Sequence, residues 1–308
     1  MDLARGGLGM PGAALLFSLW SLFIPNLLSA EQLMLPPPPP LKQHVIVLGI
    51  DGLGSHNVWR HEELGTPPPS IPTLSKLMAD GAWTLQAQID EIAVSGPNWM
   101  GMLTGAPSSR HGVRSNDCER GAGLETIFGL LRRSQPAISI TVIHEWATIY
   151  CYPEENSVNT FVKTSTTAET TGAIISALHR DLPDFIFVDY DGVDAAGHKA
   201  GGSSSTYRQA VEAVDQGIAS VLTTLDELHI ADRTYVIVLA DHGHRPEGGG
   251  HSSAEYPVPF IVYGPGVRPG QISEAVHNNQ LAPLLAHLFR SGPSPDWVMG
   301  LWPFDRYL

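Results

Sequence analysis

From residue 44 onward, short apolar runs alternate with longer segments of helical character. The runs are apolar at nearly every residue rather than at every second one, which is typical of strands that are buried on both faces of a sheet. The predicted strands are residues 44–50, 138–143, 185–190, 235–240 and 260–263. The predicted helices are residues 72–80, 123–133, 167–179, 206–228 and 280–290.

The alternation of strands and helices predicts an α/β fold, a three-layer α/β/α sandwich around a central, mostly parallel sheet. Residues 42–308 show no internal repeat, and we expect them to form a single catalytic domain. In sheets of this kind, ligands bind beyond the carboxyl ends of the strands. The residues that follow each predicted strand are therefore the first place to look for chemistry.

The first 41 residues differ from the rest of the chain. Residues 6–24 form a run of 19 uncharged residues, and we expect residues 1–30 to be a signal peptide, which makes the protein secreted or extracytoplasmic. The alternative is an uncleaved type II membrane anchor, because a run of that length is close to what spans a bilayer. Five prolines at 36–40 require an extended backbone, so residues 31–41 are predicted to be a Pro-rich spacer.

Composition narrows the classes of partner. Acidic residues outnumber basic ones 31 to 18, a formal net charge of −13, and such a surface repels polyanions, so we expect no binding to long nucleic acids. Nothing in the composition implies a stable protein partner, and contact with a membrane is expected only through an uncleaved N-terminal segment. The two cysteines, Cys118 and Cys151, could pair in an exported protein, but their spacing alone leaves this open.

Acidic and imidazole side chains follow three of the predicted strands. They are Asp51, then Asp189, Asp191, Asp194 and His198, and then Asp241, His242, His244 and His251. Gathered at one edge of a sheet, these groups would repel one another unless a cation lay among them, and oxygen with nitrogen ligands suits zinc. An Asp-Gly after a single strand is usually a turn, but three such strand ends in one chain favour a metal site.

Ser95 comes directly before a predicted helix. Pro97 and the run that ends at Gly105 indicate that the helix starts here. The hydroxyl group then lies at the positive end of the helix, where free N–H groups bind a phosphate-like anion and stabilise a serine alkoxide. Taken alone, a serine at this position is more often a helix cap.

Taken in order, these motifs resemble the alkaline phosphatase superfamily and, within it, the type I phosphodiesterases and nucleotide pyrophosphatases. The ordered set is Asp51, Ser95-x-Pro-Asn, Thr104-Gly105 with His111-Gly112-Val113, Asp194-x-x-x-His198, Asp241-His242-Gly243 and His251. The likeness runs from about His44 to about Val267.

The resemblance implies two divalent metal ions, which we expect to be zinc, with Mn²⁺ or a mixed pair left open. One ion would be held by Asp51, Asp241, His242 and the Ser95 oxygen, and the other by Asp194, His198 and His251. Ser95 would be the nucleophile and would form a phosphoseryl intermediate. Asn98 would donate a hydrogen bond to a non-bridging phosphate oxygen, with help from the Gly96 N–H group.

The sequence departs from the family pattern at two positions. Trp99 stands where sulfatases carry an arginine, so we do not expect sulfatase activity. Gly96 stands where nucleotide diesterases carry a larger residue, so we expect extra space beside the nucleophile. The chain is also short for the family and leaves little room for a cap domain. Loops would then select the substrate, and His144 and Trp146 are predicted to form one wall of the pocket, with an ordinary surface loop as the alternative.

The expected function is a phosphodiesterase that acts on a small phosphoester, because Asn98 is neutral and monoesterases of this fold more often place a positive charge near the phosphate. The alternative within the enzymes is a phosphomonoesterase, which Arg114 or Arg245 would favour by pointing into the site. An alternative from another class is a secreted pseudoenzyme that binds without turnover. The presence of all six predicted metal ligands and of Ser95 argues against it.

Overall fold

The computed structural model describes residues 42–60, 65–90, 92–253, 256–297 and 303–308. The predicted signal peptide or anchor (1–30) and spacer (31–41) lie outside the described residues and remain predictions. Within the described part of the chain, no helix is long and apolar enough to cross a membrane.

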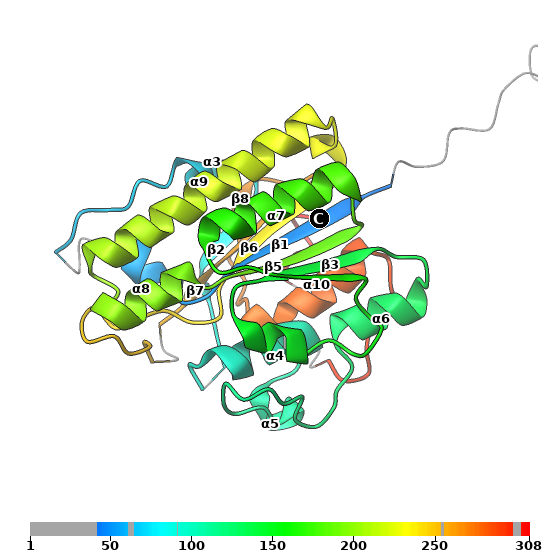
Figure 1. Cartoon of the computed structure of the whole chain (residues 1–308), viewed down its shortest axis with the longest axis horizontal. Coiled ribbons are helices and arrows are strands. Elements are labelled where there is room, and N and C mark those ends of the chain that lie inside the picture. The colour runs from blue at the N-terminus through cyan, green and yellow to red at the C-terminus, as the bar shows by residue number, and fades with distance from the viewer. Residues whose placement is uncertain (1–41, 61–64, 91, 254–255, 298–302) are drawn as a thin grey trace, which may run out of the picture. The chain divides into compact units, whose positions relative to one another are not determined.

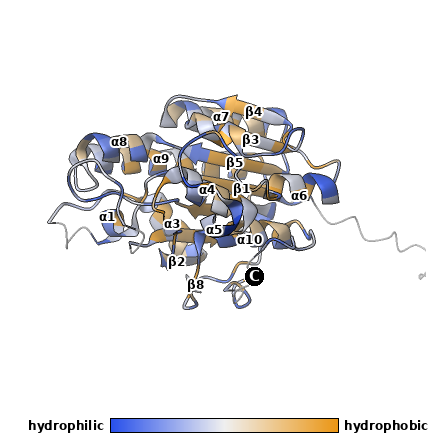
Figure 2. Ribbon diagram, turned by 90° about the horizontal axis from the view of Figure 1, so that it is seen from below, coloured by the Kyte–Doolittle hydropathy of each residue, from blue (hydrophilic) through white to orange (hydrophobic). Residues whose placement is uncertain are grey.

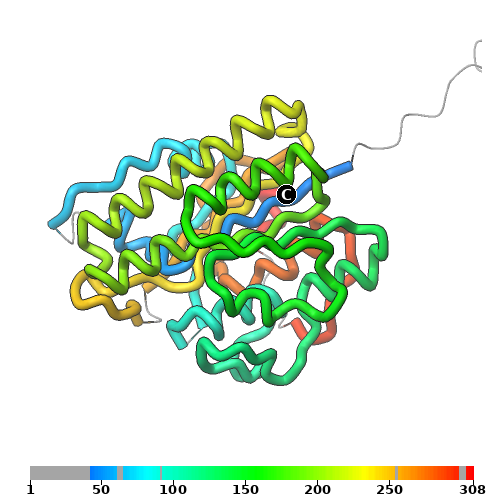
Figure 3. The backbone as a smooth tube through the Cα atoms, in the orientation of Figure 1, coloured from blue at the N-terminus to red at the C-terminus, as the bar shows by residue number. Residues whose placement is uncertain are grey.

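Eight strands form one mixed sheet in the order β4-β3-β5-β1-β6-β7-β2-β8 (Figure 1). They are β1 (His44–Ile50), β2 (Ala82–Ala87), β3 (Ile140–His144), β4 (Thr160–Lys163), β5 (Phe185–Tyr190), β6 (Thr234–Leu239), β7 (Val258–Tyr263) and β8 (Gly270–Gln271). The strands from β4 to β6 are parallel, whereas β7 is antiparallel to both of its neighbours. Figure 3 shows how β1 and β6, far apart in sequence, lie side by side.

Helices cover both faces of the sheet. On one face lie α3 (Pro72–Asp80), α7 (Thr167–Arg180), α8 (Gly192–Ala200) and α9 (Ser205–Glu227), and α9 contacts the other three. On the other lie α4 (Ser95–Thr104), α5 (Ser108–His111), α6 (Ile127–Ser134) and α10 (Leu281–Leu288). The remaining helices are α1 (Ser55–Trp59) and the 3-10 turns η2 (Ala147–Cys151), η3 (Ala231–Arg233) and η4 (Asn278–Gln280). The predicted three-layer α/β/α sandwich is confirmed.

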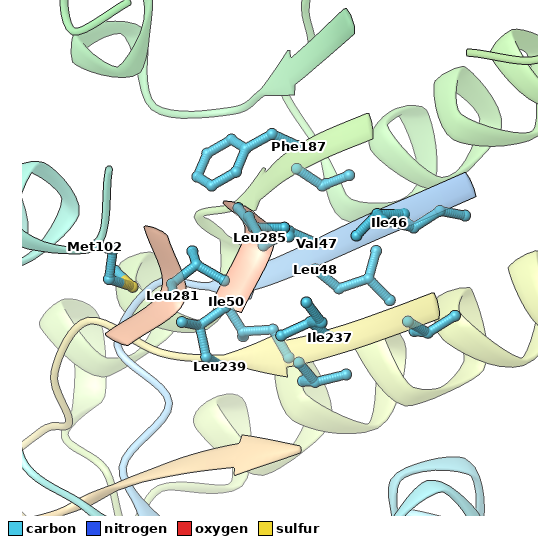
Figure 4. Close-up of a cluster of buried hydrophobic side chains, with 14 of the residues drawn as sticks. Ile46, Val47, Leu48, Ile50, Met102, Phe187, Ile237, Leu239, Leu281 and Leu285 are labelled. Carbon is cyan, nitrogen blue, oxygen red and sulfur yellow. The ribbon is translucent and has the colours of Figure 1, made fainter. Parts of the chain in front are cut away.

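The hydrophobic core explains the apolar runs of the sequence. All seven residues of β1 are buried, because helices pack on both faces of the sheet (Figure 2). In the close-up of Figure 4, Ile46, Leu48 and Ile50 of β1 lie among side chains of β5, β6, α4 and α10. The central strands are therefore fixed in place, and the positions where they end are fixed with them.

Three strands and the helices α1, α5 and α8 were absent from the sequence prediction. Strands β4 and β8 lie at the edges of the sheet and are only partly buried, so they lack the continuous apolar run that marks a central strand. Strand β2 is also only partly buried. Strand β7 runs antiparallel to both of its neighbours. The sequence could not predict this, because a short apolar run does not indicate the direction of a strand.

Gly49, within β1, makes room for a side chain of α4. A Cβ atom at this position would overlap the ring of Trp99 and lie 3.0 Å from the Val188 carbonyl oxygen. Because the Trp99 ring is fully buried, it cannot move aside without disturbing the core. We expect Gly49→Ala to lower the free energy of unfolding by about 1–3 kcal/mol, measured by urea denaturation.

Gly172→Ala is the matched control. Gly172 lies inside α7, and a Cβ atom there would meet nothing within 4 Å. Because alanine favours the helix more than glycine does, this change should raise the free energy of unfolding by roughly 0.5–1 kcal/mol. Similar effects of the two substitutions would contradict the packing described for Gly49.

Candidate metal centre

The first predicted ligand group lies where β1 and β6 end. Asp51 directly follows β1, and Asp241 and His242 follow β6. One ligand atom from each of these residues lies within 4.8 Å of the others. Ser95, the first residue of α4, lies beside them: its Oγ is 3.1 Å from His242 Nε2 and 3.4 Å from Asp51 Oδ1. The structure thus brings together four residues from three distant parts of the sequence.

The second predicted group lies on α8 and on the loop after β6. Asp194 and His198 are four residues apart on α8, so they share one face of the helix, and His198 Nε2 is 3.2 Å from Asp194 Oδ2. His251 Nε2 lies 3.0 Å from His198 Nε2 and 3.6 Å from Asp194 Oδ1. The two groups adjoin, since His242 Nε2 is 3.9 Å from Asp194 Oδ1.

A tight turn returns His251 to this group. The Arg245 N–H donates to the Gly250 carbonyl at 2.8 Å, and Gly248 and Gly249 both have positive φ angles, 82° and 66°, which glycine adopts without steric cost. The turn brings His251 alongside His244 in an antiparallel bridge.

His244 is a site residue whose role the sequence did not settle. Its Nε2 lies 2.8 Å from Asp194 Oδ1, and it belongs to the same cluster of possible ligand atoms as Asp194, His198 and His251. The side chain is fully buried. Its position two residues after His242 was the only sequence signal.

Backbone carbonyls orient three of the imidazoles. The Nδ1 atoms of His198, His242 and His251 lie 2.8, 3.3 and 2.9 Å from the carbonyl oxygens of Gly249, Gly243 and Ala93. Burial lowers the pKa of His242 to about 3 and also lowers the pKa of His251, so these two rings are neutral. A neutral imidazole that donates from Nδ1 has a free lone pair on Nε2, which is the form that binds a metal ion.

The carboxyl groups of the first cluster are buried close together. Burial raises the pKa of Asp51 well above its usual range, and the charges of Asp241 and Asp194 add to this effect; burial also raises the pKa of Asp241 to about 7. Asp241 Oδ1 accepts from the backbone N–H groups of Gly52 and His242. Its Oδ2 is buried and has no hydrogen-bond partner among the described residues. A buried acceptor of this kind, beside free imidazole nitrogens, fits a divalent metal ion.

Burial alone would raise the pKa of Asp194, but the hydrogen bond with His244 and the neighbouring imidazoles lower it. Asp194 is therefore ionised at neutral pH. An ionised carboxylate beside imidazole nitrogens suits the second ligand group.

Trp99 holds Asp51 in place. Its indole N–H donates to Asp51 Oδ2 at 3.0 Å, which leaves Oδ1 facing Ser95 and His242. The position at which sulfatases carry an arginine is thus occupied by a fully buried tryptophan.

Asn98 has a different position from the one expected. Its side-chain amide donates to the carbonyls of Ile92 and Val94, and its oxygen accepts from Asp90 N–H and Asn278 Nδ2. The side chain is fully buried. Because its donors and its acceptor are all engaged within the protein, Asn98 does not offer an amide to phosphate, and that prediction is corrected.

Asn116 lies beside the nucleophile instead. Its Oδ1 accepts from the Gly96 N–H at 2.8 Å, so the Gly96 N–H is engaged rather than free for phosphate as expected. The Asn116 side chain is exposed, and its Nδ2 has no partner among the described residues. The loop between α5 and α6 carries it, and neither periodicity nor spacing marked this asparagine.

Gly96 also leaves no extra space, contrary to expectation. A Cβ atom there would overlap the Ser115 carbonyl oxygen and lie 3.1 Å from Tyr152 Oη. The missing side chain therefore allows the 115–116 backbone to approach α4 closely, which places the Asn116 oxygen on the Gly96 N–H.

The predicted pocket wall, His144 and Trp146, is partly corrected. His144 is buried at the end of β3 and its Nδ1 lies 2.8 Å from the Trp146 carbonyl, so its ring is not a contact surface. Trp146 is half-buried, and its backbone N–H donates to Asp189 Oδ2. Its ring packs edge-on against Tyr152, so the segment is no ordinary surface loop. A substrate contact by Trp146 remains a prediction.

Two family models match the chain. The model for type I phosphodiesterase / nucleotide pyrophosphatase matches residues 45–128, and the model for the metalloenzyme superfamily matches residues 147–290. Among solved structures, murine ectonucleotide pyrophosphatase / phosphodiesterase 5 superposes with a TM-score of 0.71, at 14% identity, over 86% of this chain and 99% of that one. A 2-O GAG sulfatase superposes with a TM-score of 0.66 at 16% identity, over 86% and 74%.

The chain therefore has an alkaline phosphatase-like fold and is similar, over successive parts of its length, to type I phosphodiesterases and to the metalloenzyme superfamily. The chain is also similar in sequence to the 2,3-bisphosphoglycerate-independent phosphoglycerate mutase of Chloroflexus aurantiacus. The two are 38% identical over 140 residues, and the match covers 42% of this chain and 24% of the mutase. GPI ethanolamine phosphate transferase 1 of Gibberella zeae is 30% identical over 119 residues, 38% of this chain and 12% of the transferase. The chain thus spans about a quarter of the length of the mutases that it matches.

The stability of the metal-free protein should depend on pH in a defined window. Above about pH 7.5 an ordinary histidine, with a pKa of about 6.5, has lost most of its charge, so the buried histidines contribute little to the pH dependence there. Asp51, with a pKa raised well above its usual range, still binds a proton in the folded protein but not in the unfolded one, and Asp241, with a pKa of about 7, loses the last of its protonated fraction. The metal-free protein should therefore lose stability as the pH rises from about 7.5 to 9.

Thermal unfolding of chelated and zinc-loaded protein across this window tests the expectation. In the loaded protein the carboxyl groups are ionised in both states, so its unfolding temperature should change less with pH. Parallel pH profiles of the two forms would contradict a metal ion at Asp51 and Asp241.

Proposed function

We propose that this chain is a metal-dependent phosphodiesterase that works through a phosphoseryl intermediate on Ser95. The observation that carries the proposal is the position of Ser95 Oγ, 3.1 Å from His242 Nε2 and 3.4 Å from Asp51 Oδ1, at the first residue of a helix. A hydroxyl group at a helix start, next to candidate metal ligands, is placed to act as a nucleophile toward phosphorus.

The two ligand groups would hold two divalent ions, for which zinc is the proposed identity. Asp51, Asp241, His242 and Ser95 would bind one, and Asp194, His198 and His251 the other. Two such ions supply charge stabilisation for the attacking and the leaving oxygen of an in-line displacement.

The chain's own residues would carry the covalent steps. Ser95 Oγ forms a bond to phosphorus as the bond to the leaving alcohol breaks, and the positive end of α4 stabilises the negative charge on the transferred group. Water then breaks the bond between Oγ and phosphorus, which releases a phosphomonoester and restores the Ser95 hydroxyl. Trp99 keeps Asp51 Oδ1 directed at Ser95 throughout.

A neutral donor favours the diester. Asn116 Nδ2 lies next to the start of α4 and carries no charge, which suits the single negative charge of a diester. The exposed Arg114 and Arg245 form no ion pair with the site carboxylates among the described residues. The name of the murine structural neighbour, a nucleotide pyrophosphatase / phosphodiesterase, is consistent with a small diester. The second candidate is a phosphomonoesterase of the same fold.

The place of action that we propose is secreted or extracytoplasmic. Cys118 and Cys151 form a disulfide bond, which answers the pairing question that the sequence left open. Disulfides persist in oxidising compartments, and this supports export by the N-terminal segment.

The first test compares two chromogenic esters. Zinc-loaded protein should hydrolyse bis-p-nitrophenyl phosphate with a higher kcat/KM than p-nitrophenyl phosphate. Chelation should remove both activities, and Ser95→Ala should lower them by at least about 10³-fold because the nucleophile is lost. A higher kcat/KM for the monoester would move the protein to the second candidate.

The second test separates the two asparagines. Asn116→Asp keeps an oxygen acceptor for the Gly96 N–H but removes the Nδ2 donor, so kcat/KM for the diester should fall about 10²-fold. Asn98→Ala removes hydrogen bonds inside the core and should lower the free energy of unfolding by about 1–3 kcal/mol. Loss of turnover in Asn98→Ala at unchanged stability, with Asn116→Asp fully active, would restore the sequence-based assignment.

A further inference from the structure

Two segments that border the start of α4 are cross-linked to each other. We call residues 115–126 and 147–157 the cross-linked unit. The disulfide bond Cys118–Cys151 joins them, and Thr148 Oγ1 donates to the Asn116 carbonyl oxygen at 3.3 Å.

Further contacts fasten the far end of the cross-linked unit. The Glu154 carboxylate accepts from the backbone N–H of Thr126 at 2.8 Å and from its hydroxyl at 2.6 Å, and it also pairs with Arg120. The unit is therefore held at several points along both segments. A side chain on one segment keeps a fixed position relative to Asn116 on the other.

Tyr152 lies within the unit, directly after Cys151. Its side chain is fully buried, and its ring packs edge-on against Trp146 with 6.3 Å between centroids. Its Oη lies 3.1 Å from the point where a Cβ atom of Gly96 would stand. The phenol group is thus in contact with the residue that follows the nucleophile.

The hydroxyl group of Tyr152 has no hydrogen-bond partner among the described residues. Leaving a buried donor without a partner costs about 1–3 kcal/mol. Such a cost, at a position next to Ser95, indicates that the partner belongs to a bound ligand. The neighbouring Ser95 is itself only 4% exposed, so the nucleophile and the phenol lie in equally enclosed surroundings.

The phenol can act as a hydrogen-bond donor. An ordinary tyrosine has a pKa of about 10, and burial raises that of Tyr152, so the hydroxyl group is protonated at neutral pH. A donor in contact with Gly96 matches a phosphoryl oxygen, which is an acceptor.

We propose that Tyr152 is a phosphoryl-binding residue, whose Oη donates a hydrogen bond to an oxygen of the group that Ser95 attacks. The inference rests on the proposed function and deepens it. The cross-linked unit would present two neutral donors, one on each segment: Asn116 Nδ2 and Tyr152 Oη. Two neutral donors complement the single charge of a phosphodiester.

The test compares Tyr152→Phe with Tyr190→Phe in the zinc-loaded full chain. Tyr152→Phe removes only an unpartnered hydroxyl group, so the unfolding temperature should not fall, while kcat/KM for bis-p-nitrophenyl phosphate should fall about 10- to 100-fold. Tyr190 is also fully buried, but its Oη bonds to Thr171 Oγ1 at 3.1 Å. Tyr190→Phe should therefore lower the unfolding temperature and leave kcat/KM unchanged.

A binding measurement keeps the inference separate from the proposed function. Calorimetric titration of the zinc-loaded proteins with inorganic phosphate should show about 5- to 10-fold weaker binding to Tyr152→Phe, at equal zinc content. Wild-type kcat/KM and wild-type phosphate affinity in Tyr152→Phe would overturn the inference and leave the phosphodiesterase in place. If the wild type hydrolyses neither ester, the proposed function fails, and the phosphate affinity alone then tests whether Tyr152 binds the phosphoryl group. A zinc-loaded wild type that binds no phosphate would overturn both.

Discussion

The buried charge of Asp51 and Asp241 is the constraint on which the site depends. Both carboxyl groups are almost fully covered, and the charge of Asp241 adds to the cost of ionising Asp51. The His242 imidazole, held through Nδ1 by the Gly243 carbonyl, is neutral and does not offset this charge. Divalent cations would convert this unfavourable cluster into a stable one, and the same cations would then act on phosphoryl oxygens. Stability and chemistry thus share one origin.

The sheet makes this cluster possible because it fixes where the strands end. Strands β1, β5 and β6 are parallel neighbours, so the residues that follow them meet at one edge. Gly49 in β1 admits the Trp99 ring, and Trp99 in turn orients Asp51. The helix α4 therefore does two things at once: it places Ser95 at the cluster and sends an indole N–H to the carboxylate that Ser95 faces.

The sequence was sufficient for the fold class and for the residues that follow central strands. Continuous apolar runs marked β1, β5 and β6, and the polar residues that follow these runs could be recognised directly in the sequence. The loops were less predictable, because their conformations depend on contacts between distant segments. Asn98 sits in the motif but is turned into the core by Asp90 and Asn278. Asn116 is brought to Gly96 by a close backbone approach, which no local pattern encodes.

The cross-linked unit shows how two loops outside the sheet can be held rigid beside Ser95. The ligands Asp51, Asp241 and His242 are anchored by the ends of central strands, whereas residues 115–118 lie in a loop and residues 147–151 form the 3-10 turn η2, outside the sheet. The disulfide Cys118–Cys151 and the Glu154 contacts supply the missing rigidity. Fixed donors gain more for catalysis than mobile ones, since they need no reorganisation as charge develops. A covalent link between two loops therefore gives this side of the site the rigidity that the sheet gives to the metal ligands.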